Sequence, residues 1–542
     1  MEDLRLHATT EPDGGGSATI GEDPAKLTTI LKHQHRCMPL TLQIPILGGK
    51  GLGGSDKPML LRLIYDDSLA QAAYLIGCQK TGEAIVFDPE RDVDRYIELA
   101  AANGLRIVAT AETHIHADFL SGSRELAERV GATVYVSAEG GADWTYGWLN
   151  DRSGGGAYEH RMLVDGDTFD IGNIRFRALH TPGHTPEHLS FEVTDLGSGA
   201  SEPMGLLTGD FVFVGDLGRP DLLETAAGIA ATKEPAAREL GKSAAAFLEF
   251  SDYLQVWPGH GSGSACGKAL GAVPQSTVGY ERRYNPALQL ADDADAFVKF
   301  ILSGQPDPPQ YFARMKQLNR DGVPVLDGLP HPEHFAVEQL AAIDTKKVAV
   351  IDTRGPQKYQ RGHLAGSIMS LSGVGFLSSV GSFIGPDEDI VLIVERDRLE
   401  ETVRQLIRIG LDRVIGWASP STLAVALESI GGGACLDTVS PGDVPAMRDA
   451  GAAVLDVRTT VECEHGMIEG AVNIPYTQLL DRFDELPSGE PVIINCKGGT
   501  RSAAACSMLA RSGRTVANLE GGYMAWTAAK QDDASRTPQQ TS

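Results

Sequence analysis

The feature that most constrains the fold of this chain is a repeat in its C-terminal half. An apolar run that ends at Asp352 is followed ten residues later by Gly362, and ten residues likewise separate Asp456 from Gly466. Each copy continues with a second apolar run and then a helical pattern. Short apolar runs of this kind, bounded by turns, are typical of buried parallel strands. The repeat therefore predicts two successive small parallel α/β domains.

The N-terminal half has a different pattern, in which several strands are interspersed with fewer helices. Its apolar runs predict strands over residues 60–65, 73–77, 83–88, 106–110, 133–137, 174–180, 189–193 and 254–257. Helical spacing predicts helices over residues 91–103, 120–130 and 234–250. This mixture indicates a layered α/β domain.

The chain has 542 residues, enough for three or four folded units. We divide it into an N-terminal extension that we expect to be poorly ordered, the layered domain, the two repeat domains and a disordered tail. The predicted boundaries are 1–58, 59–305, 320–430, 437–531 and 532–542. Turn-rich glycine segments mark the extension, a Gly- and Pro-rich stretch at 304–309 marks the end of the layered domain, and polar composition marks the tail.

Charge and cysteine usage exclude several classes of protein. The chain has 47 Lys and Arg against 72 Asp and Glu, a net charge of −25, so we expect no nucleic-acid partner. It has no run of about 18 apolar residues, so we expect no membrane-spanning helix and no membrane partner. Seven scattered cysteines, an odd number, favour a reducing compartment, and we expect a cytoplasmic protein.

Histidines and carboxylates at strand ends are the main functional signal of the layered domain. The residues are His114, His116, Asp118, His184, Asp210 and His260. Imidazole and carboxylate groups that converge at strand ends commonly build a metal site. Each residue alone is weak evidence, because a single histidine is more often a structural hydrogen-bonding group. Together and in this order they predict a metal centre.

The main functional signal of the last domain is a cysteine in a short loop. Cys496 follows the apolar strand 491–494 and precedes the helical run 503–511. Backbone N–H groups of such a loop and the helix N-terminus favour a thiolate, and Lys497 and Arg501 add positive charge. A reactive cysteine needs this environment, so Cys496 is the predicted nucleophile.

The first repeat domain lacks a corresponding nucleophile. Where its second apolar run ends, the chain reads Glu395-Arg-Asp-Arg, and no cysteine occurs between Cys266 and Cys435. We therefore expect this domain to be a non-catalytic spacer or docking domain.

On these motifs, residues 59–300 resemble the metallo-β-lactamase superfamily, and within it the persulfide dioxygenases, which are similar in sequence to glyoxalase II. Further matching segments are Gly218–Asp221 and Ser276–Pro286. The resemblance implies an αββα sandwich. It places one Fe(II) per chain on His114, His184 and Asp210, with His116, Asp118 and His260 orienting ligands and water around it.

One departure from the superfamily pattern limits the chemistry. The pattern H-x-H-x-D-H ends here in Phe119, where two-metal hydrolases have a histidine that holds the second zinc. A phenyl ring cannot bind a metal, so a binuclear thioester hydrolase is disfavoured. The remaining set of two histidines and one carboxylate leaves positions open for substrate and O₂, as in non-haem Fe(II) oxygenases.

The resemblance also points to residues around the substrate. It places Arg219 and Asp221 near the substrate entrance, although an ordinary loop ion pair is an equally good interpretation. Cys266 lies six residues after His260 in a glycine-rich loop. It is either a buried structural cysteine or a sulfur-handling residue whose pKa is lowered by Lys268.

Residues Leu455–Trp526 resemble a rhodanese sulfurtransferase domain. Cys496 and Arg501 enclose four residues, which gives the six-residue loop of sulfurtransferases rather than the longer loop of related phosphatases. Met467 replaces the usual histidine of the G-H-I signature, which we interpret as a structural substitution. The first repeat domain resembles the same fold in an inactive form.

The combination resembles bacterial persulfide dioxygenase–sulfurtransferase fusions. It implies oxidation of a small-molecule persulfide by O₂ to sulfite and on to thiosulfate, as in sulfide detoxification, by a homo-oligomer (a dimer or tetramer). One alternative is a glyoxalase II-like thioester hydrolase with a rhodanese module. Another is a non-enzymatic sulfur carrier that docks partners through its rhodanese-like domains.

Overall fold

The structure is a computed structural model that describes residues 58–225 and 231–536, all within one compact unit. The predicted extension, residues 1–58, lies outside the described residues except for Pro58. The last helix, α17 (Gly522–Arg536), continues into the segment 532–542 that the sequence predicts to be a tail. The remainder of that segment is outside the described residues.

The layered domain contains two six-stranded sheets. The first has the order β1-β2-β3-β4-β5-β6 and consists of β1 (Met59–Asp66), β2 (Gln71–Cys78), β3 (Glu83–Phe87), β4 (Arg106–Ala111), β5 (Thr133–Ser137) and β6 (His160–Leu163). The second has the order β12-β11-β10-β9-β8-β7 and consists of β7 (Thr168–Ile171), β8 (Ile174–His180), β9 (Leu189–Asp195), β10 (Gly205–Gly209), β11 (Gln255–Pro258) and β12 (Ser276–Thr277). Every residue of β2 is buried, which explains its nearly continuous apolar sequence.

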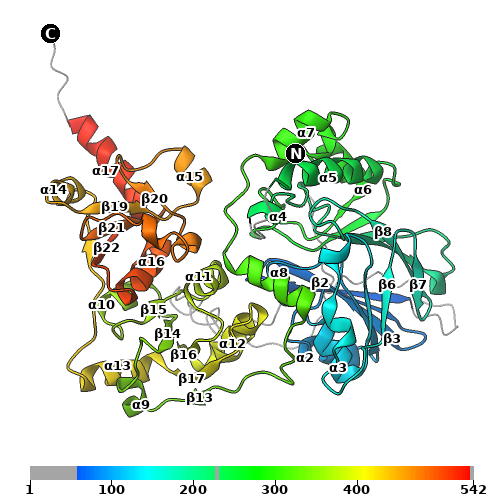
Figure 1. The fold of residues 1–542 in the computed structure, drawn as a ribbon, viewed down its shortest axis with the longest axis horizontal. Helices are drawn as coiled ribbons and strands as arrows, with labels where there is room; N and C mark the ends of the chain where they lie inside the picture. The colour runs from blue at the N-terminus through cyan, green and yellow to red at the C-terminus, as the bar shows by residue number, and fades with distance from the viewer. Residues whose placement is uncertain (1–57, 226–230, 537–542) are drawn as a thin grey trace, which may run out of the picture. The chain divides into compact units, whose positions relative to one another are not determined.

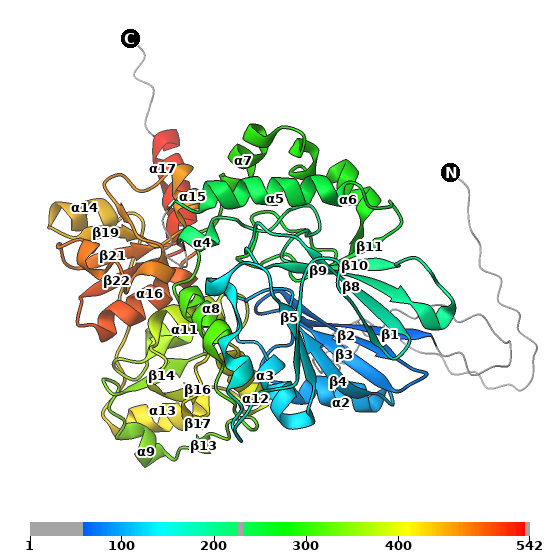
Figure 2. The ribbon, with the colours of Figure 1, turned by 45° about the vertical axis from the view of Figure 1, so that its right-hand side comes forward.

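The domain has four layers, because the two sheets pack face to face and helices cover the outer face of each sheet. The inner faces meet in an apolar core in which Phe87 contacts Phe176 and Phe191, with ring centroids 5.2 and 5.0 Å apart. The outer faces are covered by α2 (Asp94–Ala102) and α3 (Ser123–Val130) on the first sheet, and by α5 (Lys233–Phe247), α6 (Val278–Tyr284) and α7 (Ala294–Leu302) on the second (Figures 1 and 2). The predicted αββα sandwich is confirmed.

The two repeats form two five-stranded parallel sheets with the same strand order. The first sheet consists of β13 (Glu333–His334), β17 (Val414–Ala418), β16 (Asp389–Ile393), β14 (Val348–Asp352) and β15 (Ile368–Met369). The second consists of β18 (Thr438–Val439), β22 (Val516–Leu519), β21 (Val492–Asn495), β19 (Ala453–Asp456) and β20 (Val472–Asn473). Repeated topology agrees with the predicted pair of α/β domains.

The ten-residue spacing of the repeat has a structural cause. In the second copy Arg458 pairs with Asp456 at the end of β19, and it also donates to the carbonyl oxygen of Gly466, each at 2.7 Å. In the first copy Arg354 makes the same two contacts, with Asp352 and with the carbonyl of Gly362, again at 2.7 Å. The conserved geometry joins the strand end to the following turn in both domains.

The remaining helices connect and cover these sheets. They are α4 (Leu222–Thr225), α8 (Tyr311–Asp321), α9 (Val337–Ala341), α10 (Pro356–Arg361), α11 (Phe376–Phe383), α12 (Leu399–Arg408), α13 (Pro420–Ser429), α14 (Val444–Asp449), α15 (Thr460–Glu464) and α16 (Thr500–Arg511). Helix α8 follows the predicted linker, and its last two residues lie within the predicted first repeat domain, 320–430. Among the helices that the structure describes, none has the length and hydropathy needed to cross a bilayer.

Candidate metal centre and cysteine loop

Three side chains from separate loops meet at one edge of the sandwich. His114 lies three residues after β4, His184 lies between β8 and β9, and Asp210 directly follows β10. All three are buried, and their potential ligand atoms lie within 4.8 Å of one another. The structure thus brings together the three residues that the sequence predicts as metal ligands.

The donor atoms of this group suit a cation. Nδ1 of His114 contacts the Thr113 hydroxyl at 2.9 Å, and Nδ1 of His184 contacts the carbonyl oxygen of Arg219 at 3.1 Å. Both Nε2 atoms therefore face Asp210, whose Oδ2 lies 3.9 Å from His114 Nε2 and 3.5 Å from His184 Nε2. This Oδ2 is buried and has no hydrogen-bond partner in the described part of the chain. A bound metal ion would satisfy it.

The protonation states of the group also fit metal binding. Burial lowers the pKa of His114 well below its ordinary value and also lowers the pKa of His184, so both imidazoles are neutral. Burial opposes the charge of Asp210, but the charge and hydrogen bond of His260 hold the pKa of this carboxyl well below its usual value. Neutral imidazole and ionised carboxylate are the forms that bind metals.

His260 occupies the position between the two acidic residues of the site. Its Nδ1 lies 2.7 Å from Asp210 Oδ1, and its Nε2 lies 2.8 Å from Asp118 Oδ2. Although burial opposes protonation, these two carboxylates raise the pKa of His260 to about 10. Because both ring nitrogens are already engaged, His260 orients Asp210 and leaves Asp210 Oδ2 free.

Cys266 lies beside this pair, and Asp118, His260 and Cys266 form a second buried group of potential ligands. Burial, followed by the nearby carboxylates, raises the pKa of the Cys266 thiol well above its ordinary value. The Lys268 ammonium donates to backbone oxygens at residues 300 and 303. The prediction that Lys268 lowers the thiol pKa is therefore wrong, because burial and negative charge dominate.

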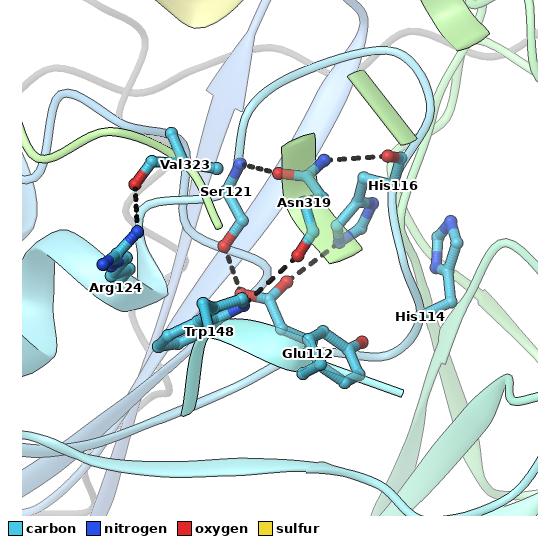
Figure 3. A pocket seen from close by; sticks show the side chains of 9 residues that line it. Glu112, His114, His116, Ser121, Arg124, Trp148, Asn319 and Val323 are labelled. Carbon is cyan, nitrogen blue, oxygen red and sulfur yellow. Dashed lines mark hydrogen bonds and ion pairs between the residues drawn. The ribbon is translucent and has the colours of Figure 1, made fainter. Parts of the chain in front are cut away.

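His116 points into a third buried group, with Asp88 and Glu112. Its Nε2 lies 3.1 Å from Asp88 Oδ1 and 3.2 Å from Glu112 Oε2. Glu112 also accepts hydrogen bonds from Ser121 and Ser123. Figure 3 shows the contacts of Glu112 with His116 and with Ser121. A cavity of about 10 Å³, room for one water molecule, adjoins this network. His116 is thereby held by carboxylates of its own network.

Phe119 fills the place beside His116 without offering a ligand. Its side chain is completely buried, and its ring centroid lies 4.4 Å from that of His116. Phe119, which stands where the superfamily pattern has a histidine, thus makes a packing contact with His116.

The predicted substrate-binding pair forms a buried ion pair. Two nitrogens of Arg219 contact the carboxylate of Asp221 at 2.6 and 3.1 Å. A third nitrogen of Arg219 donates to the carbonyl of Ala265 at 2.9 Å and so ties this loop to the loop of Cys266. The geometry matches the loop ion-pair interpretation, and a role in substrate binding stays a prediction.

Sequence reasoning missed two supporting residues that follow His184. His188 Nε2 accepts the backbone N–H of Asp210 at 3.1 Å, and burial lowers the pKa of His188 to about 3, which keeps it an acceptor. Glu187 Oε1 accepts the N–H of Ile115 at 2.7 Å. The run His-Thr-Pro-Glu-His at 184–188 was the available signal, because it places two further polar groups beside a predicted ligand.

The cysteine loop of the last domain connects β21 to α16. Cys496 is buried, and its Sγ accepts hydrogen bonds from the backbone N–H of Gly499 at 3.1 Å and from the Ser502 hydroxyl at 3.3 Å. Gly499 has a φ of +100°, a conformation that favours glycine, and it caps α16. The loop therefore aims the expected kind of backbone donor at the sulfur, and Ser502 adds a side-chain donor that was not expected from the sequence.

The two basic residues of this loop differ in their surroundings. Arg501 forms a two-pronged ion pair with Glu462 of α15, at 2.7 and 2.8 Å. Burial opposes ionisation of Glu462, but Arg501 lowers its pKa to about 2. Lys497 is exposed. The positive charge expected near Cys496 is thus present, although the charge of Arg501 is shared with a carboxylate.

Fold and site together define the class: an αββα protein with a candidate metal centre, extended by domains of sulfurtransferase-like topology. The metallo-beta-lactamase superfamily profile matches residues 67–260, and the profile of the rhodanese-like domain matches residues 440–529. The solved metallo-beta-lactamase of Staphylococcus aureus subsp. aureus COL is 38% identical, with a TM-score of 0.60, over 67% of this chain and 100% of that one. The chain belongs to the metallo-β-lactamase superfamily and carries a C-terminal rhodanese-like domain.

Among the curated relatives, two illustrate the similarity. Human mitochondrial persulfide dioxygenase ETHE1 is 28% identical over 250 residues, which cover 46% of this chain and 83% of that protein. A probable metallo-hydrolase of Burkholderia pseudomallei is 30% identical over 180 residues, 30% of this chain. That match spans 60% of the Burkholderia protein.

Proposed function

We propose that this chain is a non-haem Fe(II) persulfide dioxygenase coupled to a rhodanese sulfurtransferase. The observation that carries the proposal is the arrangement of donor atoms at the metal centre. Among the described residues of the site, Asp210 Oδ2 is buried without a hydrogen-bond partner, and the Nε2 atoms of His114 and His184 lie 3.9 and 3.5 Å from it. The similarity to persulfide dioxygenases supports the same assignment.

The residues around the centre prepare it for one metal ion. His114, His184 and Asp210 would hold Fe(II), which would supply the capacity to bind a persulfide sulfur and O₂ and to transfer electrons between them. His260 holds Asp210 Oδ1 and fixes the orientation of the carboxylate. Burial of all three ligands excludes bulk water and strengthens these electrostatic contacts. The overall reaction is R–S–SH + O₂ + H₂O → R–SH + SO₃²⁻ + 2 H⁺.

The cysteine loop would carry the second half of the reaction. The Cys496 thiolate attacks the outer sulfur of a persulfide, its S–S bond breaks, and the thiol R–SH leaves. Sulfite then attacks the outer sulfur of Cys496–S–S⁻, so that thiosulfate forms and the thiolate returns. The Gly499 N–H and the Ser502 hydroxyl, which donate to Sγ, stabilise the sulfur anion at each stage.

The decisive measurement is O₂ uptake with glutathione persulfide as the probe, by the Fe(II)-loaded and the metal-free protein. We expect uptake only from the loaded protein. We also expect Cys496→Ser to retain this uptake but to release sulfite in place of thiosulfate. Absence of iron-dependent uptake would refute the dioxygenase assignment, and an unchanged thiosulfate yield from Cys496→Ser would refute the role of the cysteine.

A glyoxalase II-like thioester hydrolase is the alternative, and the buried group of Asp118, His260 and Cys266 is the observation in its favour. Against it, both nitrogens of His260 are already bonded to carboxylates, and Phe119 offers no ligand. Two tightly bound zinc ions per chain together with thioester hydrolysis would establish this alternative.

A further inference from the structure

The loop that carries His114 is anchored by different parts of the chain at its two ends. Its beginning is held within the layered domain. The backbone N–H and the hydroxyl of Thr113 donate to Asp88 at 2.7 and 2.9 Å, and the N–H of Ile115 donates to Glu187. The first half of the loop is therefore positioned by residues of the same domain.

The second half of the loop is held by one side chain of α8. Asn319 Nδ2 donates to the carbonyl oxygens of His116 at 2.8 Å and of Phe119 at 2.7 Å, and Asn319 Oδ1 accepts the N–H of Ser121 at 2.8 Å. Figure 3 shows this amide facing the loop at Ser121 and His116. The buried amide of Asn319 thus makes three hydrogen bonds to backbone groups of the six-residue segment 116–121.

The segments that contact the second half of the loop are themselves fixed by packing and hydrogen bonds. The carbonyl oxygen of Asn319 accepts the indole N–H of Trp148 at 3.2 Å, and α8 buries Phe312 and Met315 in an apolar cluster shared with both repeat domains. A second contact comes from the C-terminal end of α12 in the inactive domain, where the carbonyl of Arg408 accepts the N–H of Leu120 at 2.7 Å. Both α8 and α12 lie beyond the residues that match the superfamily profile.

We propose that Asn319 is a positioning residue of the metal centre, and that the inactive rhodanese-like domain supports the ligand loop through the backbone contact between Arg408 and Leu120. The inference rests on the metal centre of the proposed function but not on the reaction catalysed there. Asp118 lies in the second half of this loop and His114 directly precedes that half, so release of the second half displaces the partner of His260 and removes the support on the C-terminal side of His114. The non-catalytic domain is then part of the metal site and not a spacer.

The test compares metal affinity among variants of the full chain. Asn319→Leu has a similar volume and removes all three hydrogen bonds. Asn319→Asp keeps the acceptor for Ser121 but places a second oxygen against two carbonyl oxygens. Gln317→Leu, at an exposed position of the same helix, is the matched control. Fe(II) binding is measured by competition with a coloured chelator, at a temperature below the unfolding midpoint of each metal-free protein.

Loss of groups that orient metal ligands typically weakens metal affinity 10–100-fold. We expect a loss of about this size for Asn319→Leu, a clear loss for Asn319→Asp, and a change below about twofold for Gln317→Leu. Wild-type affinity in a folded Asn319→Leu or Asn319→Asp protein would overturn the inference. If the wild-type chain itself binds no Fe(II), the metal centre is refuted, and the two failures are thereby distinguished.

Discussion

Replacing Arg408 by methionine tests a buried charge cluster between the layered domain and the first repeat domain. The Arg408 guanidinium contacts Asp66 at 2.7 Å, Asp92 at 2.7 and 3.0 Å, and Glu90 at 3.1 Å. All four side chains are almost completely buried. Methionine fills a similar volume but leaves the carboxylates without this partner.

The size of the stability loss depends on the buried carboxylates that remain after Arg408 is removed. Breaking a buried ion pair costs about 3–5 kcal/mol, because an uncompensated charge is left in the interior. Burial, against the pull of Arg408 and Arg95, raises the pKa of Glu90 to about 8, so Glu90 is largely protonated at pH 7. Arg95 and Arg404 still contact Asp92, at 3.5 and 3.3 Å. We therefore expect a loss near the lower limit, about 3 kcal/mol at pH 7.

Urea unfolding of the metal-free protein, followed by tryptophan fluorescence, measures this loss as the midpoint shift multiplied by the m-value. The control is Arg413→Met, which removes an exposed pair with Asp389 and should cost less than about 1 kcal/mol. In Arg408→Met the unpaired carboxyls have raised pKa values in the folded state, so the deficit should shrink as the pH falls toward 5. Equal losses in the two variants would refute the reasoning.

Three further predictions concern the two sites. In protein loaded with zinc in place of iron, Phe119→His should raise the number of bound ions per chain from one toward two, because an imidazole then stands beside Asp118; an unchanged number of ions would contradict this. The pair of Glu462 and Arg501 stabilises the fold above pH 4.5 and loses its effect as the pH falls toward 2, the folded-state pKa of Glu462. Glu462→Gln should therefore lower the unfolding midpoint at pH 7 by an amount equivalent to about 1 kcal/mol, with the gap to wild type closing below pH 3. Chelation of the metal should abolish O₂ uptake and leave sulfur transfer at Cys496 intact, whereas parallel loss of both would show that the sites depend on each other.

Local patterns in the sequence were sufficient to predict the architecture and the types of functional group. The repeat spacing predicted two α/β domains, and it has a structural basis in each of them: an arginine joins the strand end to a turn ten residues further along the chain. The order of histidines and aspartates predicted a metal centre, and the resemblance to a known family assigned the ligand roles to His114, His184 and Asp210, each of which lies in a loop that follows a strand. The loop of Cys496 was recognisable because strand, turn and helix are adjacent in the chain.

The tertiary structure alone decided which of these groups is free to bind a metal. His260 and His116 have the same chemistry as His114, but both ring nitrogens of His260 and the Nε2 atom of His116 already contact carboxylates. The hydrogen bonds of Asn319 and Arg408 to the loop of His114 could not be predicted from the sequence either, because these residues lie about 200 and 290 positions after that loop. Periodicity and spacing report on neighbours along the chain, whereas hydrogen bonds between distant segments arise only when packing brings those segments together.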